Sequence, residues 1–253
     1  MTTTVPTPAS TPAQTVPEDA GLFSAPLRKA VNLVGGAAMF ATPLLIIGGE
    51  LTSPPQASRA MSDYIESLAR DPFLSSVSAS LLHYGWITTA LGLILAMTLV
   101  RGRKGRILTL VGGLAGGFAA VQMSALMLND YFLSALGNNL AMGDAVKVAE
   151  AMMVHGDVAS LLWWQSGKLA IILPVLLYAG LARAGVISWW LVPLSLLPMV
   201  VPYMVMGLVG GSSDQLIGSN ALGILAGGLT GLICYAPTFL VGVRLINRGR
   251  LAA

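Results

Sequence analysis

Apolar residues in this chain fall in blocks of about 20 residues, the length at which an α-helix crosses the hydrocarbon core of a bilayer. Short polar or glycine-containing segments separate the blocks. This pattern predicts an all-α fold, a polytopic bundle of six transmembrane helices. We expect the spans at about residues 30–49, 73–100, 107–129, 160–182, 187–209 and 221–245.

The first residues of the chain, 1–26, have a different composition, rich in Thr, Pro and Ala. A segment with so little apolar mass does not pack, which predicts a disordered cytoplasmic tail. The first basic pair, Arg28 and Lys29, precedes a full-length apolar span rather than the short apolar stretch of a signal peptide. We expect the remaining residues, 27–253, to form a single transmembrane domain.

The positive charges predict how the spans are oriented. Ten of the 14 Lys and Arg residues lie on one side of the predicted membrane, in the two terminal segments and in the RGRKGR and ARAGV links. Cytoplasmic loops carry the excess of Lys and Arg in membrane proteins. We therefore expect a protein of the cell membrane with both termini cytoplasmic.

Two longer connections, residues 50–72 and 137–156, fall on the opposite, outer side. Each contains apolar residues at helical spacing, over residues 57–69 in the first and 143–154 in the second. Two arrangements stay open for these predicted helices. They lie flat at the outer surface as interfacial helices, or they cap the bundle as ordinary loop helices.

Glycines recur one turn apart in two spans: Gly112-Gly113 and Gly116-Gly117 in the third, and Gly223, Gly227 and Gly231 in the sixth. Small residues at this spacing let helix backbones approach closely in lipid. We expect these faces to pack against other spans, against other membrane subunits or against a second copy of the chain. The fifth span contains three prolines, which predict a bent or broken helix there.

Composition agrees with a membrane protein. The chain is 55% hydrophobic and 10% charged, whereas soluble domains carry about 25% charged residues. The net charge of +3 arises from basic residues at the ends of spans, so the expected partner is the lipid bilayer and not a nucleic acid. Cys234 is the only cysteine, which excludes an intramolecular disulfide.

Ionisable residues within apolar spans are costly and mark candidate functional sites. In the predicted orientation, those of this chain gather in the outer half of the bundle or directly above it. They predict an outward-facing polar pocket that binds a ligand or handles protons. The candidate residues are Glu50, His83, Asp130 and Lys168 in the spans, and His155 and Asp157 on the loop above.

Structural explanations stay open for two of these residues. Lys168 extends its ammonium along lipid to the headgroups, or pairs with Asp130 or Glu50 inside the bundle, or serves a function. Its neighbours Gln165, Ser166 and Gly167 form a polar turn that suits an interior face. His83 is a buried histidine with one hydrogen bond, a proton carrier or ligand contact, or a metal or haem ligand.

The motifs of common catalytic chemistries are missing from the sequence. The chain contains no GxxxxGKS/T phosphate loop, no HExxH or CxxC, and no GxSxG elbow. We therefore expect no catalytic residue, no metal and no cofactor, in a protein that is not an enzyme.

Four local features of the first 135 or so residues occur together. They are GELTSPP at the end of the first span, SDYIESLARDP before the second, HYGW within it, and RGRKGR before the glycine-rich third. In this arrangement the chain resembles uncharacterised six-span bacterial integral membrane proteins. The resemblance implies the six-span topology and no particular activity.

Taken together, the sequence predicts a small integral membrane protein of accessory, sensory or structural type with an outward-facing polar pocket. A transporter or export-permease subunit is the first alternative, since six spans with cytoplasmic termini are also the layout of many export permeases. A membrane redox protein that uses His83 is the second alternative.

Overall fold

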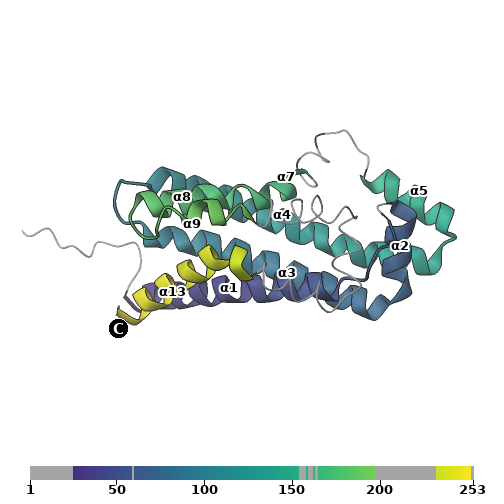
Figure 1. Ribbon diagram of the computed structural model, residues 1–253, viewed down its shortest axis with the longest axis horizontal. Helices are drawn as coiled ribbons and strands as arrows, with labels where there is room; N and C mark the ends of the chain where they lie inside the picture. The colour runs from purple at the N-terminus through teal and green to yellow at the C-terminus, as the bar shows by residue number, and fades with distance from the viewer. Residues whose placement is uncertain are drawn as a thin grey trace, which may run out of the picture.

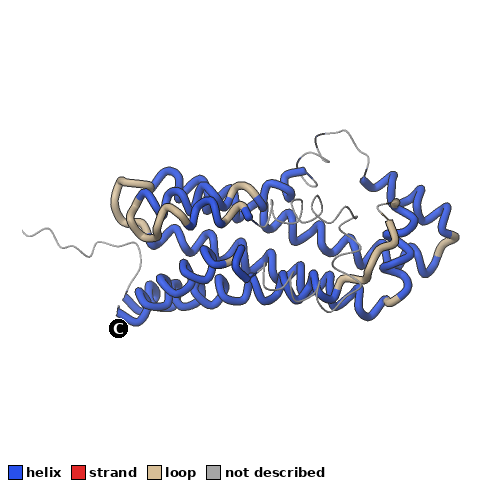
Figure 2. The backbone as a smooth tube through the Cα atoms, in the orientation of Figure 1, coloured by secondary structure: helices blue, strands red, loops and turns tan. Residues whose placement is uncertain are grey.

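The structure is a computed structural model that describes residues 25–58, 60–153, 158, 162, 165–197 and 232–251. Within these ranges every regular element is a helix, which confirms the all-α class (Figure 1, Figure 2). The elements are α1 (Ala25–Thr52), α2 (Met61–Arg70), α3 (Pro72–Ala96), η1 (Met97–Leu99), α4 (Arg106–Asn139), α5 (Met142–Met153), α7 (Ser166–Lys168), η3 (Leu169–Ile171), α8 (Pro174–Arg183), α9 (Leu191–Leu194) and α13 (Ala236–Leu251). The predicted tail and most of the predicted fifth and sixth spans lie outside the described residues.

Four segments in the described part of the chain are long and apolar enough to cross a membrane: Pro26–Thr52, Pro72–Leu99, Arg106–Asn139 and Ser166–Arg183. They coincide with the first four predicted spans. Their outer surfaces are apolar, and on α4 the exposed side chains include Leu110, Leu114, Phe118 and Val121. A continuous apolar exterior belongs against lipid rather than water. Length, composition and surface together indicate a membrane protein.

Helices that are neighbours in the bundle are not always consecutive in the sequence (Figure 1). α1 packs on α3, α3 on α4 and α4 on α8, while α13 returns to pack on α1. The short α9 contacts both α8 and α13 and so joins the two sides. The last described helix of the chain therefore lies beside the first.

Glycines on two faces of α4 allow its neighbours to approach closely. A Cβ added at Gly112 would lie 2.1 Å from the backbone nitrogen of Leu177 on α8. One added at Gly113 would lie 2.4 Å from the Met97 side chain beyond the end of α3. The predicted close packing of this span is thus confirmed within the bundle. The glycines of the predicted sixth span lie outside the described residues.

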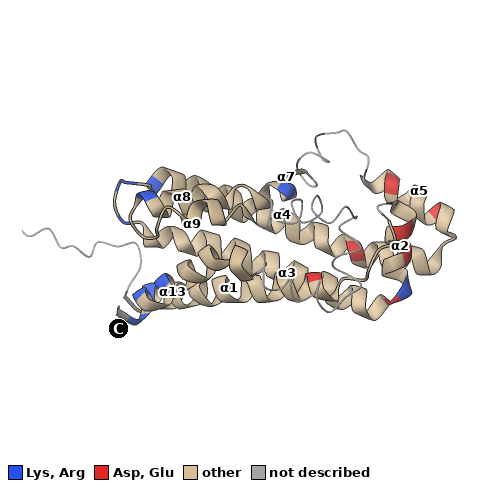
Figure 3. Cartoon of the chain, viewed as in Figure 1, with Lys and Arg blue, Asp and Glu red and all other residues tan. Residues whose placement is uncertain are grey.

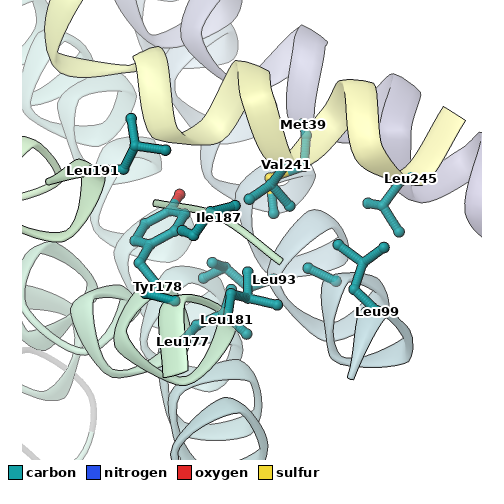
Figure 4. Close-up of a cluster of buried hydrophobic side chains, with 12 residues drawn as sticks. Met39, Leu93, Leu99, Leu177, Tyr178, Leu181, Ile187, Leu191, Val241 and Leu245 are labelled. Carbon is teal, nitrogen blue, oxygen red and sulfur yellow. The ribbon is translucent and has the colours of Figure 1, made fainter. Parts of the chain in front are cut away.

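A hydrophobic cluster fills the bundle where α1, α3, α8, α9 and α13 converge (Figure 4). Its large members are Met39, Leu93, Leu99, Leu177, Tyr178, Leu181, Ile187, Leu191, Val241 and Leu245. In lipid, such side chains hold helices together through the many van der Waals contacts of close packing. This cluster, called the core cluster below, therefore holds together segments from both halves of the chain.

A second cluster forms a cap at the other end of the bundle. At 1.5 Å per residue, a helix of 34 residues such as α4 is about 51 Å long, well beyond a hydrocarbon core of about 30 Å. α2 and α5 pack on the projecting end of α4 through a cluster that includes the buried Ile65, Leu68 and Leu133. Of the two arrangements open for the predicted outer helices, the structure therefore shows the capping one.

Two serine hydroxyls tie the cap to the bundle. Ser75 at the start of α3 and Ser134 on α4 both donate to the Leu68 carbonyl oxygen, at 2.8 and 2.9 Å. This carbonyl belongs to the last turn of α2, where helix carbonyls lack partners within the helix. The two bonds therefore fix how α2 ends and turns into α3.

The charged residues separate along the long axis of the molecule (Figure 3). Lys and Arg gather at the end formed by the start of α1, the α3–α4 link, the end of α8 and the end of α13, which we call the basic end. Asp and Glu lie toward the cap. This distribution matches the side assignment made from the sequence.

The predicted fourth span, 160–182, is not one continuous helix. A short α7 is followed by the 3₁₀ turn η3, and a regular helix begins only at Pro174. Proline has no N–H to donate and disfavours helical geometry in the residue before it, so it starts a helix rather than continuing one. α9, which contains Pro193, likewise ends after Leu194, in keeping with the break predicted for the fifth span.

The close contact of α4 with α8 yields a prediction about stability. Gly112→Ala places a Cβ against the backbone of α8, which cannot move as a flexible side chain would. We expect a loss of about 1–3 kcal/mol, the usual cost of overpacking. Gly143→Ala is the control, because a Cβ there meets nothing within 4 Å. Thermal unfolding of the purified protein in detergent measures both, and equal melting temperatures for the two variants would contradict the packing described.

Candidate functional site

A cavity of about 150 Å³ lies inside the bundle, next to the core cluster. Met39, Leu93 and Tyr178 belong to both the core cluster and the cavity wall. The core cluster therefore forms the floor of the cavity on the side of the basic end. The other described wall residues come from α1, α3, η3, the start of α8, the turn after α9 and the approach to α13.

The two long helices each present one face to the cavity. Residues three or four apart share a face of a helix, and the wall residues follow this spacing: Met39, Thr42, Ile46 and Glu50 on α1, then Trp86, Thr89 and Leu93 on α3. The remaining described walls are Ala170, Ile171, Pro174, Tyr178, Ser195, Cys234, Tyr235 and Thr238. Apolar and aromatic surface predominates, with a few polar groups set into it.

Most of the hydroxyl groups in the wall are engaged within the protein. Thr42 Oγ1 donates to the Ala38 carbonyl at 3.0 Å, and Thr89 Oγ1 donates to the Gly85 carbonyl at 2.8 Å. Tyr178 and Thr238 share a hydroxyl–hydroxyl bond of 2.8 Å. These groups make the wall polar in places, but the protons of Thr42 and Thr89 and one proton of the Tyr178–Thr238 pair are already directed at protein acceptors.

Glu50 differs from the other wall residues because it is charged. It ends the cavity-facing row of α1, and its side chain is exposed, so it lies at the rim. Among the described residues no Lys, Arg or His lies within ion-pair distance of its carboxylate. Glu50 is close enough to Tyr235 to interact with it electrostatically. Of the residues selected from the sequence, it is the one that lines the cavity.

His83 occupies a different place, between α3 and α4. Its Nδ1 lies 2.7 Å from Ser124 Oγ and 3.2 Å from the Ser124 carbonyl oxygen. The Tyr84 ring meets the imidazole edge-on, with the ring centroids 5.0 Å apart. His83 is thus half-buried and contacts Ser124 of the neighbouring helix, whereas a fully buried histidine with one hydrogen bond was one of the alternatives left open above. The described residues contain no group of three His, Cys, Asp or Glu side chains that could hold a metal.

Asp130 and Lys168 do not form the pair considered from the sequence. Asp130 accepts a hydrogen bond from the Tyr64 hydroxyl, which joins α4 to α2 in the cap. Lys168 is exposed, and the ion pairs between described residues are Glu66–Arg70 and Asp144–Lys147.

Close packing explains the position of Lys168. Gly167 faces α4, where an added Cβ would lie 2.8 Å from Leu126. The next residue, Lys168, is rotated by about 100° around the helix axis and so points away from α4.

The remaining candidates, His155 and Asp157, lie outside the described residues. The four selected residues that the structure describes lie at different positions: Glu50 lines the cavity, while His83, Asp130 and Lys168 do not. The candidate residues were selected for their charge, so they did not include the aromatic wall residues Trp86, Tyr178 and Tyr235. The spacing of Thr42, Ile46 and Glu50 was a usable indication, because it places one threonine and one carboxylate on the same face of α1.

Comparisons with known proteins add no relative: no protein-family model matches the chain, and no similar protein was found among curated proteins or solved structures.

We expect the hydrogen bond between Tyr64 and Asp130 to stabilise the cap. Tyr64→Phe removes the hydroxyl and leaves the Asp130 carboxylate without its donor, which costs about 1–3 kcal/mol for a buried group. Tyr131→Phe is a matched control, since Tyr131 lies next to Asp130 but is exposed. Denaturant unfolding compares the two variants, and an equally small effect of both would show that the bond does not stabilise the cap.

The same tyrosine predicts a response to high pH. Burial raises the pKa of Tyr64 above its ordinary value of 10.0, and the charge and hydrogen bond of Asp130 raise it further. Since the folded-state pKa exceeds the unfolded one, the contribution of Tyr64 to stability is complete below about pH 10 and is lost as the pH rises above it. Unfolding free energy should fall more steeply between about pH 9 and 11 in the wild type than in Tyr64→Phe. If the unfolding free energy falls equally steeply with pH in the wild type and in Tyr64→Phe, the raised pKa of Tyr64 is contradicted.

Proposed function

We propose that this chain is a six-span integral protein of the cell membrane, with both termini cytoplasmic, that binds a small molecule in its central cavity from the outer side. It is then of accessory or sensory type: the bound molecule is recognised and not chemically changed. The cavity is the observation that carries this proposal.

Three features of the cavity support ligand binding. It lies in an otherwise tightly packed bundle, where close-packed interiors leave few voids larger than a water molecule. Its walls combine apolar and aromatic surface with a few polar groups, the usual make-up of small-molecule sites. An engineered protein cavity of about 150 Å³ binds benzene, so a ligand of that size fits here.

The floor of the cavity supports access from the outer side. The core cluster separates the cavity from the basic end, whereas the rim residue Glu50 lies near the end of α1 that is away from the basic end. The basic end is the cytoplasmic one if the positive-inside rule holds for this chain. A ligand would then enter beneath the cap.

Aromatic side chains support the placement of the bilayer. Trp189 and Trp190 are exposed beside the basic end, and Tyr131 is exposed toward the cap. Along α4, the 25 residue-to-residue steps from Arg106 to Tyr131 span about 38 Å at 1.5 Å per step. This separation suits two aromatic belts on either side of a hydrocarbon core of about 30 Å.

A transporter subunit is the second candidate, and one observation favours it. The segment α7–η3–α8 is discontinuous where Ala170, Ile171 and Pro174 line the cavity. Secondary transporters often form their substrate sites from discontinuous membrane helices near the midplane. Transport of the ligand across vesicles, as opposed to binding alone, would distinguish this candidate.

The orientation is tested by labelling with a membrane-impermeant thiol reagent on intact cells. In a Cys234→Ala background, a cysteine at Ser62 or Asp144 in the cap should react, and one at Gly105 in the basic α3–α4 link should not. The reverse pattern would overturn the orientation and with it outer access to the cavity.

Ligand binding is tested with benzyl alcohol, a neutral molecule of suitable size, on protein in lipid nanodiscs. The ligand should raise the melting temperature of the wild type, because a ligand that binds only the folded state stabilises it. Thr89→Phe fills the cavity and should abolish the shift. Ser80→Phe, on the exposed side of α3, should keep it. A shift that Thr89→Phe leaves intact would refute binding in the cavity.

A further inference from the structure

We propose that the cavity selects small organic monocations, molecules that join an ammonium group to an apolar body about the size of benzene. This inference rests on the proposed function, since it requires that the cavity hold a ligand. It goes further by assigning a charge to that ligand and a role to Glu50.

The carboxylate of Glu50 is the first reason. It is the one charged group among the described residues that line the cavity, and it has no ion-pair partner among them. Because Glu50 lies exposed at the rim, its carboxylate gives the entrance of the cavity a negative charge that attracts cations. Lys168 does not supply the pair, because its side chain is exposed and lies apart from the cavity wall. A cationic ligand would supply it.

Aromatic rings are the second reason. Trp86 from α3, Tyr178 from α8 and Tyr235 before α13 all line the cavity, so three different segments present a ring to it. The faces of aromatic rings attract cations, and cages of such rings recognise quaternary and methylated ammonium groups. Tyr235 and Glu50 line the same cavity, so a ligand inside it can meet both a ring and the carboxylate.

The hydroxyl groups are the third reason, because they disfavour an anion. The protons of Thr42 and Thr89 have acceptors within the protein, and Tyr178 and Thr238 use one of their two protons on each other. No Lys or Arg is present among the described wall residues to supply a positive charge. An anionic ligand would therefore meet an unpaired carboxylate and few free donors, whereas a cation meets acceptors and ring faces.

The test compares three ligands that share a benzene ring and differ in charge: benzylammonium, benzyl alcohol and benzoate. Affinities are measured by calorimetry on the full-length protein in nanodiscs of zwitterionic lipid, which avoids attraction of cations to the membrane. In the wild type we expect benzylammonium to bind at least about tenfold more tightly than benzyl alcohol, and benzoate to bind most weakly.

Variants then test whether Glu50 causes the preference for benzylammonium over benzyl alcohol. Glu50→Gln keeps the shape of the side chain and should reduce the preference for benzylammonium to about that of the alcohol, while Glu50→Asp should keep part of it. Glu66→Gln, which changes an exposed carboxylate paired with Arg70 in the cap, should have no effect. Equal affinities for the amine and the alcohol in the wild type, or a preference that survives in Glu50→Gln, would overturn the inference.

The two proposals fail in different ways. If benzyl alcohol binds and Thr89→Phe blocks it, but charge makes no difference, the cavity is a ligand site and the cation inference is wrong. If no ligand binds in a manner that Thr89→Phe blocks, the proposed function itself is wrong.

Discussion

The rest of the structure depends on how closely helix backbones approach α4. Between helices in lipid the hydrophobic effect does not drive association, so contact relies on close packing of small residues. Gly112 lets α8 approach one face of α4, and Gly113 lets the segment after α3 approach the other. Because these glycines lie in the part of α4 nearest the basic end, they hold that end of the bundle tightly closed.

The cavity follows from this closure. Near the basic end, the core cluster fills the space between α1, α3, α8 and α13 with large apolar side chains. Farther along, the segment opposite α1 and α3 changes from a regular helix to a 3₁₀ turn ahead of Pro174. Its irregular backbone and small residues such as Ala170 leave space beside the faces of α1 and α3. The tight end of the bundle thus follows from the glycines of α4, and the hollow part follows from the irregular segment before Pro174.

The length of α4 has a separate consequence. The helix extends beyond the thickness of a bilayer, and α2 and α5 use its projecting end as a support. Tyr64 and the serines at positions 75 and 134 add directional bonds to this apolar contact. The cap therefore stands over the side on which Glu50 lies, where it is placed to influence access to the cavity.

The helical class, the first four of the six predicted spans and the close packing around Gly112 could be predicted from the sequence, because hydrophobic period and glycine spacing are local properties of the chain. The sequence predicted the polar site poorly. Charged residues were expected to converge, but Asp130 bonds to Tyr64, His83 bonds to Ser124, and Lys168 points away from α4. Which helices become neighbours decides such contacts, and the return of α13 to α1 could not be deduced from spacing within any single span. Tyr235 reaches the cavity only through that return.

The native Cys234 offers the most direct test of the central claim, that the cavity is closed toward the basic end and open toward the cap. This single thiol lines the cavity. The measurement is its rate of modification by a small, impermeant thiol reagent added to either side of oriented membrane vesicles. The structure predicts modification from the cap side, slowed by Thr89→Phe, and none from the side of the basic end. Modification from the basic end, or a rate from the cap side that Thr89→Phe does not change, would contradict the account.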